Sequence, residues 1–430
     1  MQRRLALERS APLWLSMRFF VSAPLFALLA AALLLWQGPQ LFASRWSPAA
    51  LAATHLLTLG VLTMVIGGAL LQLLPVVAGV AIPRAALAAP AIHLLLCAGT
   101  LLLAGAFCWS QPLLFQLALA PLAVALAWLA GACATGLWRA RAADAITNPD
   151  ADAGAGPMLG GVRIALAALG VTALPGLAMA AAFAWPLSLP MALRHLNGLT
   201  ELHVLWGWAG WIGVLVIAIA HQVIPMFQVT PLYPRGLTRA LCRAIAGLIL
   251  AGCAAQLLGH GSATALRALL AAPFVVFALA TLVLLGRRKR PGPDATTLFW
   301  RLAMASLLAA AALWCAAVDG RARGLLLGLL FMLGFAYSAV LGMLYKIVPF
   351  LLWQHWQEQR LDKPVPGIRL IITEAAARAQ FLGHLAALGL LAAAVLWPAP
   401  LARIAALAML ASTLHFIWIL RRALRLPLQQ

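Results

Sequence analysis

Three stretches of this sequence share one pattern, and that pattern decides the fold. They are HLLTLGVLTMVIGGALLQLLP (residues 55–75), HVLWGWAGWIGVLVIAIAHQVIP (203–225) and MLGFAYSAVLGMLYKIVP (332–349). Each ends in a proline, with a glycine fifteen residues earlier and a long polar side chain three residues earlier. Small residues allow membrane helices to approach closely, so we interpret the pattern as an internal repeat of membrane helices. The shared residues are Gly60, Gly210 and Gly334, then Gln72, Gln222 and Lys346, then Pro75, Pro225 and Pro349.

Composition indicates that lipid is the solvent for most of the chain. The chain has 430 residues, of which 64% are apolar and only 9% are charged, and its mean hydropathy is +0.98. A soluble domain carries about 25% charged residues, so this chain has too few to cover a water-facing surface. The net charge of +20 does not indicate nucleic acid, because the basic residues lie in short clusters between apolar runs. Such clusters orient membrane segments.

Apolar runs of about 20 residues, the length that crosses a bilayer, predict an all-α integral membrane protein with twelve transmembrane helices. No small-residue cleavage site follows the first run, so we expect a retained helix and not a signal peptide. The connections are short, so residues 1–430 are expected to form a single polytopic membrane domain. The expected spans are 18–37, 49–79, 86–108, 113–138, 161–183, 197–228, 241–259, 268–286, 299–318, 324–353, 375–397 and 401–420.

The distribution of basic residues supports this count independently of hydropathy. Placing the N-terminus and every second loop in the cytoplasm puts 24 of the 30 Lys and Arg residues on that side. One missed or added helix would scramble the alternation. We therefore predict that the N and C termini are both cytoplasmic.

The repeated stretches fall in the second, sixth and tenth expected spans, so the repeat has a period of four helices. Glycine and proline are common in membrane helices, but three shared positions at this period go beyond composition. The sequence thus predicts three pseudo-repeated four-helix arcs, at approximately 18–138, 161–286 and 299–420.

Histidines are the main candidates for chemistry, because ionisable residues at membrane depth are costly and usually face the bundle interior. Neutral imidazole is a common ligand for iron and copper, so two helices that present His55 and His203 at one depth suit a haem. The alternative is that each histidine makes an interhelical hydrogen bond and nothing else. The predicted outer layer holds His55, His195, His203 and His260, and the inner layer holds His93, His221, His384 and His415.

The sixth span carries both His203 and His221, eighteen residues apart. In an uninterrupted α-helix this spacing is five turns, so both side chains would lie on one face, about 27 Å apart along the axis. We expect a glycine-lined face that suits a cofactor or a pore. Glu201 is a candidate proton-transferring catalytic residue, and the alternative is a loop carboxylate.

Tyr345 and Lys346, near the end of the tenth span, have two interpretations. One is a point of proton uptake, and the other is an interfacial tyrosine beside a lysine whose side chain reaches the surface. Internal repeats are also common in transporters. A transporter or channel with a histidine-lined path is therefore an alternative function, and an assembly partner of a respiratory complex is another.

The stretches at 55–75 and 201–225 resemble two related groups of membrane proteins. One is the catalytic subunit I of haem-copper oxidases and nitric oxide reductases. The other is the NnrS family of haem- and copper-containing membrane proteins linked to nitric oxide. In both groups a histidine near the outer end of a helix precedes a glycine-rich stretch. The oxidase subunit has twelve helices in three arcs of four, so the topology matches over the whole chain, but individual residues match only in the three long helices.

This resemblance implies haem b and copper as cofactors. Carried over by position, His55 corresponds to an axial ligand of the low-spin haem. His203 and His260 fall where the oxidases place copper ligands, and His195 is a further candidate. The resemblance also implies a bacterial cytoplasmic (inner) membrane location and respiratory-chain proteins as partners. An enzyme of this kind would be an oxidoreductase acting on nitric oxide or oxygen.

Departures from the oxidase pattern bear on this activity. Residues 324–353 lack the pair of haem-ligating histidines, and His260 stands alone where the oxidases have two adjacent histidines. Gly207 stands four residues after His203, in place of the cross-linked tyrosine. These departures argue against a complete oxygen- or nitric-oxide-reducing centre. The sequence therefore predicts a haem- and/or copper-binding membrane protein in nitric oxide or respiratory metabolism, with no nucleic-acid partner.

Overall fold

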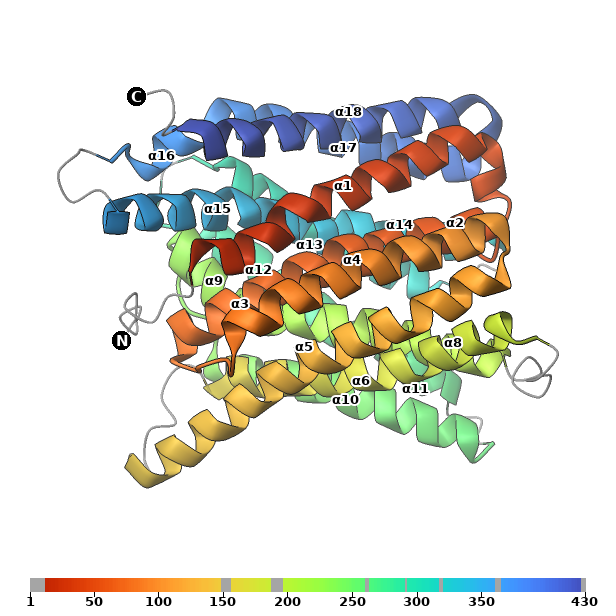
Figure 1. Ribbon diagram of the computed structural model, residues 1–430, viewed down its shortest axis with the longest axis horizontal. Helices are drawn as coiled ribbons and strands as arrows, with labels where there is room; N and C mark the ends of the chain where they lie inside the picture. The colour runs from red at the N-terminus through yellow and green to blue at the C-terminus, as the bar shows by residue number, and fades with distance from the viewer. Residues whose placement is uncertain are drawn as a thin grey trace. The chain divides into compact units, whose positions relative to one another are not determined.

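The computed structural model of this protein consists of membrane helices joined by short connections (Figure 1). Within the described residues, twelve helices are long and apolar enough to cross a bilayer, and no β-strand is present. The predicted all-α, twelve-helix fold class is therefore confirmed, and the protein is a multi-pass membrane protein. The structure describes residues 12–147, 156–186, 196–259, 263–290, 292–316, 320–359 and 365–426.

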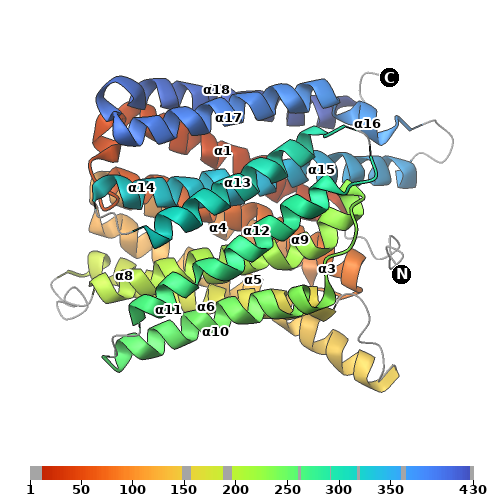
Figure 2. The ribbon, with the colours of Figure 1, turned by 180° about the vertical axis from the view of Figure 1, so that it is seen from behind.

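The spans follow the colours of Figures 1 and 2 along the chain. The first six are built from α1 (Leu13–Gln37) with the 3₁₀ segment η2 (Gly38–Phe42), α2 (Pro48–His55) with η3 (Leu56–Thr63) and α3 (Met64–Ala78), α4 (Ala85–Trp109), α5 (Pro112–Thr147), α6 (Gly156–Ala184), and α8 (Leu196–Leu205) with η4 (Trp206–Gly213) and α9 (Val214–Gln228). The last six are built from α10 (Arg235–Leu257), α11 (Ala263–Leu269) with α12 (Ala271–Gly286), α13 (Ala295–Cys315), α14 (Arg321–Leu329) with η5 (Leu330–Tyr337) and α15 (Ser338–Gln359), α17 (Glu374–Leu396) after the short α16 (Ile368–Ile371), and α18 (Pro398–Arg425).

Each predicted span corresponds to one observed span, and the differences lie at the ends. The seventh span begins at Arg235, earlier than the predicted residue 241, and it carries Arg239 within its first turns. Long basic side chains can follow a helix past the hydrocarbon layer and keep their charge in the headgroup region. Hydropathy alone therefore starts such a helix too late.

The second, sixth and tenth spans each contain a π-helical segment: η3, η4 and η5. Each segment has eight residues, and each begins 19 residues before and ends 12 residues before the repeat proline of its span. π-Helical turns are rare and are frequent at functional sites. The repeat thus has a shared backbone feature as well as shared residues. The grouping of all twelve helices into three arcs stays a prediction.

The repeat glycine is the fifth residue of each π segment, and each one is in close contact with a neighbouring helix. A Cβ atom would lie 2.4 Å from the Phe26 ring at Gly60, 2.8 Å from Ala168 at Gly210 and 2.6 Å from Ser306 at Gly334. Such distances are not tolerated between real atoms, so glycine allows the contact. The three partner residues are on α1, α6 and α13.

The chain divides into two compact units, which we describe separately. The central unit contains residues 66–289, and the terminal unit contains residues 12–65 with 290–430. In the central unit α4 packs along α5, and α5 along α6. In the terminal unit α17 packs along α18, and α18 along α1 (Figures 1 and 2).

Helix α4 shows how the side chains sort between lipid and protein. Leu87, Leu94 and Leu101 recur every seven residues and are 58%, 65% and 48% exposed. Seven residues is about two turns, so the three leucines form one stripe. Ile92 and Leu96 on the same helix are fully buried. A stripe of exposed leucines is suited to contact with lipid chains, which agrees with a membrane location.

Candidate functional site

His203 on α8 is held in one orientation by its neighbour α6. Its Nδ1 lies 2.9 Å from the carbonyl oxygen of Thr172. A carbonyl can only accept, so Nδ1 carries the proton and Nε2 of the neutral ring carries the lone pair. Gly176 provides the space for the ring, because a Cβ there would lie 2.7 Å from Cε1 of His203. Metal-ligating histidines usually fix their second nitrogen in this way.

His55 has a related but local arrangement in the terminal unit. It is the last residue of α2, directly before η3, and its Nδ1 lies 2.8 Å from the carbonyl oxygen of Leu51 in the same helix. It is half-buried. His55 lies 20 residues before its repeat proline, whereas His203 lies 22 residues before its own. The two histidines are therefore at neighbouring, not identical, repeat positions.

His221 on α9 is a buried imidazole without a polar partner. Neither ring nitrogen has a hydrogen-bond partner in the part of the chain that the structure describes, and the residue is 8% exposed. Its ring lies edge-on to Tyr233, with centroids 4.9 Å apart, and 6.2 Å from the ring of Phe277. The Tyr233 hydroxyl hydrogen-bonds to Thr281 Oγ1 at 2.8 Å. A buried polar group left unpaired costs about 1–3 kcal/mol, so the His221 ring is a candidate binding group.

The expectation that His203 and His221 share one face is wrong. The π-helical η4 lies between them, and a π turn holds more residues than the 3.6 of an α turn. The five-turn spacing therefore does not apply. The two histidines also have different neighbours, because His203 contacts α6 whereas His221 contacts Tyr233 and Phe277.

His93 and His415 make local contacts on their own helices. Nε2 of His93 lies 3.7 Å from Sγ of Cys97, and the ring of His415 lies 5.9 Å from that of Trp418. Each partner is three or four residues further along the same helix. These two members of the predicted inner layer are thus placed at helix surfaces that are partly exposed.

His384 on α17 belongs to a buried polar cluster in the terminal unit. Its Nε2 lies 2.8 Å from Oγ of Ser338 on α15, and its ring lies 5.5 Å from that of Tyr337. The Ser338 hydroxyl also reaches the carbonyl of Leu333 at 3.1 Å. His384 is 5% exposed and Ser338 is fully buried. Buried polar groups at membrane depth are functional-site candidates.

A second chain of hydrogen bonds extends this cluster. The Tyr345 hydroxyl donates to Oε1 of Gln380 at 3.1 Å, and Nε2 of Gln380 donates to Oγ of Ser412 at 3.2 Å. Tyr337, His384 and Ser412 line a cavity of about 10 Å³. This is about the smallest volume that holds one water molecule. The two chains therefore meet at a space of one water.

An ion pair lies beside this cluster, at the N-terminal end of α13. Nζ of Lys346 lies 2.8 Å from Oδ2 of Asp294. The other oxygen of Asp294, Oδ1, caps α13 by accepting from the Thr297 backbone N–H at 2.9 Å. Burial raises the pKa of the Asp294 carboxyl, but the hydrogen bonds and charge of Lys346 and Thr297 outweigh this and lower it below its ordinary value. Lys346 is next to Tyr345, so the ion pair is adjacent to the polar chain.

Glu201 on α8 has the contacts of a carboxylate at a helix end. Its Oε2 lies 2.9 Å from Nη2 of Arg267, and its side chain is 53% exposed. Gln256 contacts the same oxygen at 3.4 Å. The ion pair is partly exposed, and Glu201 has no hydrogen bond to the His203 ring among the described residues.

Of the predicted copper ligands, the structure describes His203. His195 and His260 lie outside the described residues. In the described ranges, no three His, Cys, Asp or Glu side chains form a group able to hold a metal ion.

Sequence reasoning did not single out Tyr337, Ser338, Gln380, Ser412 or Asp294. One signal was available for two members of the cluster, because Gln380 and His384 are four residues apart in a helix that has no charged residue after Arg378. Residues at this spacing lie on one helical face. The contacts of Ser338 and Ser412 depend on helix packing, which no sequence spacing reports.

Comparison with protein-family models and curated proteins does not identify a relative. No protein-family model matches the chain. No curated protein matches it significantly either. What the protein does is therefore inferred from its own residues.

Proposed function

We propose that this multi-pass membrane protein binds a haem, which His203 would hold through Nε2, and serves nitric oxide or respiratory metabolism. The observation that supports this proposal is the Nδ1 contact of His203 with the Thr172 carbonyl. It fixes the tautomer in which Nε2 is the basic nitrogen, as a metal ligand requires. A bound haem would supply one-electron chemistry and a site for a diatomic gas.

The donor chemistry of the described residues fits such a group. The imidazole of His203 is half-buried against α6, with its Nδ1 directed at a carbonyl oxygen. His55 has the same Nδ1-to-carbonyl arrangement and is a second candidate ligand for a haem or copper ion. The unpaired nitrogens of His221 make it a third. Thr172 and Gly176 orient the His203 ring and are positioning residues.

The absorption spectrum and metal content of the detergent-purified protein test this proposal. The wild type should show a Soret band and bound iron, and His203→Ala should lose both. His355→Ala is the matched control, because His355 is near the end of α15, far along the chain from the proposed ligands, and should leave the spectrum unchanged. A wild-type protein with neither haem nor copper, although folded, would contradict the proposal. Bound copper without haem would show that the cofactor is copper and not haem.

A second candidate function is proton or ion movement through the terminal unit. The observation that favours it is the hydrogen-bonded chain from Tyr345 through Gln380 to Ser412, beside the cavity at His384. Lys346, which pairs with Asp294, follows Tyr345 in the sequence. Hydroxyl, amide and imidazole groups in series can relay a proton when a water bridges the last gap.

Proton flux into liposomes that contain the purified protein tests this second function. Gln380→Leu removes the link between Tyr345 and Ser412, so flux under an imposed potential should fall to the level of empty liposomes. Gln357→Leu, at an exposed position near the end of α15, should leave it unchanged. Equal flux in the wild type and Gln380→Leu would remove this candidate.

A further inference from the structure

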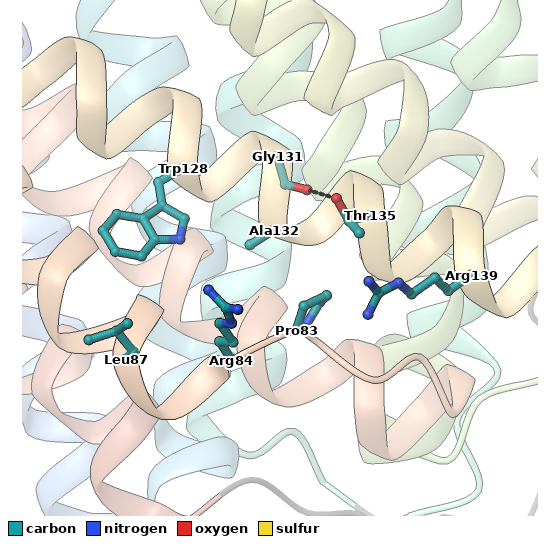
Figure 3. Close-up of a pocket in the computed structure, with 8 residues that line it drawn as sticks. All are labelled: Pro83, Arg84, Leu87, Trp128, Gly131, Ala132, Thr135 and Arg139. Atoms are coloured by element: carbon teal, nitrogen blue, oxygen red, sulfur yellow. Dashed lines mark hydrogen bonds between the residues drawn. The ribbon is translucent and has the colours of Figure 1, made fainter.

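A groove lies between α4 and α5 of the central unit (Figure 3). Its volume is about 630 Å³, within the range of about 300–1,000 Å³ that small-molecule sites occupy. Arg84 and Arg139 line it from two different elements, and Trp128 and Leu87 supply apolar surface. The groove therefore combines two cations with an apolar wall.

The connection from α3 to α4 is held against α5 to form this groove. A Cβ at Gly136 would lie 2.8 Å from the carbonyl oxygen of Ala81, so the glycine lets the connection rest on α5. Gly79 turns the chain with φ +69°, and Arg84 has φ +48°. A left-handed arginine is uncommon, so its conformation is imposed by its surroundings. The position of Arg84 beside α5 is thus a built feature of the fold.

The groove opens toward lipid, with its cations at headgroup depth. Helix α5 has 36 residues and a length of about 54 Å, well beyond the 30 Å or so of bilayer hydrocarbon. Arg139, close to its C-terminal end, therefore extends into the headgroup layer. Leu87, one turn above Arg84, begins the exposed leucine stripe of α4.

Neither arginine has an anionic partner in the part of the chain that the structure describes. Arg84 and Arg139 are exposed, and neither side chain forms an ion pair or hydrogen bond among the described residues. Arginine recognises phosphate well because its planar guanidinium donates several hydrogen bonds in fixed directions. A ligand that brings phosphate to membrane depth and also covers Leu87 and Trp128 is a phospholipid.

We propose that this groove is a binding site for an anionic phospholipid. The phosphate lies between Arg84 and Arg139, and an acyl chain follows Leu87 and Trp128. Basic pockets between membrane helices are suited to anionic headgroups, and the net charge of the lipid decides the preference over a zwitterionic one. The proposal is independent of any cofactor at His203.

Native mass spectrometry of the delipidated protein tests this site with two lipids of equal chain length. Dioleoyl phosphatidylglycerol should bind more tightly than dioleoyl phosphatidylcholine. Arg84→Gln with Arg139→Gln should weaken phosphatidylglycerol binding by about fivefold per arginine and leave phosphatidylcholine binding unchanged. The matched control is Arg235→Gln with Arg239→Gln, two exposed arginines on α10 that do not line the groove. It should retain the wild-type preference.

Two further measurements separate the groove from general surface charge. Gly136→Leu keeps both arginines but pushes the α3–α4 connection off α5, so it should lose the preference as well. Millimolar inorganic phosphate should not displace the lipid, because phosphate alone makes no apolar contact. The proposal would be overturned if the groove double variant and the α10 double variant lost phosphatidylglycerol affinity equally, or if phosphate displaced the lipid. The absence of any lipid preference in the wild type would overturn it as well.

Discussion

Two residues of α6 decide how His203 is oriented. Thr172 supplies the carbonyl that fixes the tautomer, and Gly176 supplies the space for the ring. The sequence singled out His203 by its place in the repeat, but it gave no indication of these two neighbours. Thr172 and Gly176 lie 31 and 27 residues before His203 in the chain, so their contact with His203 depends on how α6 packs on α8.

Replacing Gly176 by alanine should displace the His203 ring and lower the haem content of the purified protein. The reason is the 2.7 Å separation between the new Cβ and Cε1. Gly170→Ala on the same helix is the control, because nothing lies within 4 Å of a Cβ there. Alanine also favours a helix over glycine by about 0.5–1 kcal/mol, so the control should be at least as stable as the wild type. Haem content per protein measures the effect, and equal haem in both variants would contradict this account.

Asp294→Asn should destabilise the protein at neutral pH by about 1 kcal/mol or less, since the ion pair with Lys346 is partly exposed. Asparagine caps a helix about as well as aspartate, so the change removes mainly the charge. The lowered pKa of Asp294 means that its contribution is present above the unfolded-state pKa and is lost as pH falls through the folded-state pKa. Thermal unfolding should therefore show a difference from the wild type at pH 7 that begins to shrink near pH 4 and disappears below the lowered folded-state pKa. A constant difference at all pH values would exclude this role.

At the scale of elements, the three π-helical segments are the feature that hydropathy does not predict. An α-helical and a π-helical segment give similar apolar runs in the sequence. The second, sixth and tenth spans are therefore predicted correctly as spans, but the prediction that they are uninterrupted α-helices is wrong. The consequence reaches the candidate site, because η4 removes the common face of His203 and His221.

The close contact at η4 can be tested by exchanging its two small residues. Gly210→Ala should destabilise the protein by about 1–3 kcal/mol, because the new methyl lies 2.8 Å from the Cβ of Ala168. Adding Ala168→Gly removes that Cβ and should recover most of the loss. Unfolding measurements on the two single variants and the double variant give the coupling between the sites. Purely additive effects would show that the contact does not hold α6 against η4.

At the scale of the whole molecule, composition and run length predicted twelve crossings, and the structure confirms them within the described residues. The polar cluster of the terminal unit was beyond the sequence, because its members come from α15, α17 and α18, which pack together only in the fold. His384, Tyr345 and Lys346 were the members singled out, and they lie beside Ser338, Gln380 and Asp294.

The predicted orientation, with both termini in the cytoplasm, follows from the alternation of arginine and lysine. Fusions of a fluorescent protein that matures only in the cytoplasm should be bright at the C-terminus and after residue 290. Alkaline phosphatase, which folds only outside, should be active when fused after Leu258 and inactive after residue 290. The reverse pattern would contradict the orientation and leave the twelve crossings intact.

Chemical rescue of His203 tests the central claim most directly. His203→Gly removes the imidazole and leaves a space of the same shape next to Gly176. The purified variant should lack the Soret band of the wild type, and added imidazole should restore it by occupying that space. His355→Gly should be unaffected by either change. A wild type without haem, or a His203→Gly variant with the full wild-type spectrum in the absence of imidazole, would contradict His203 as the haem ligand.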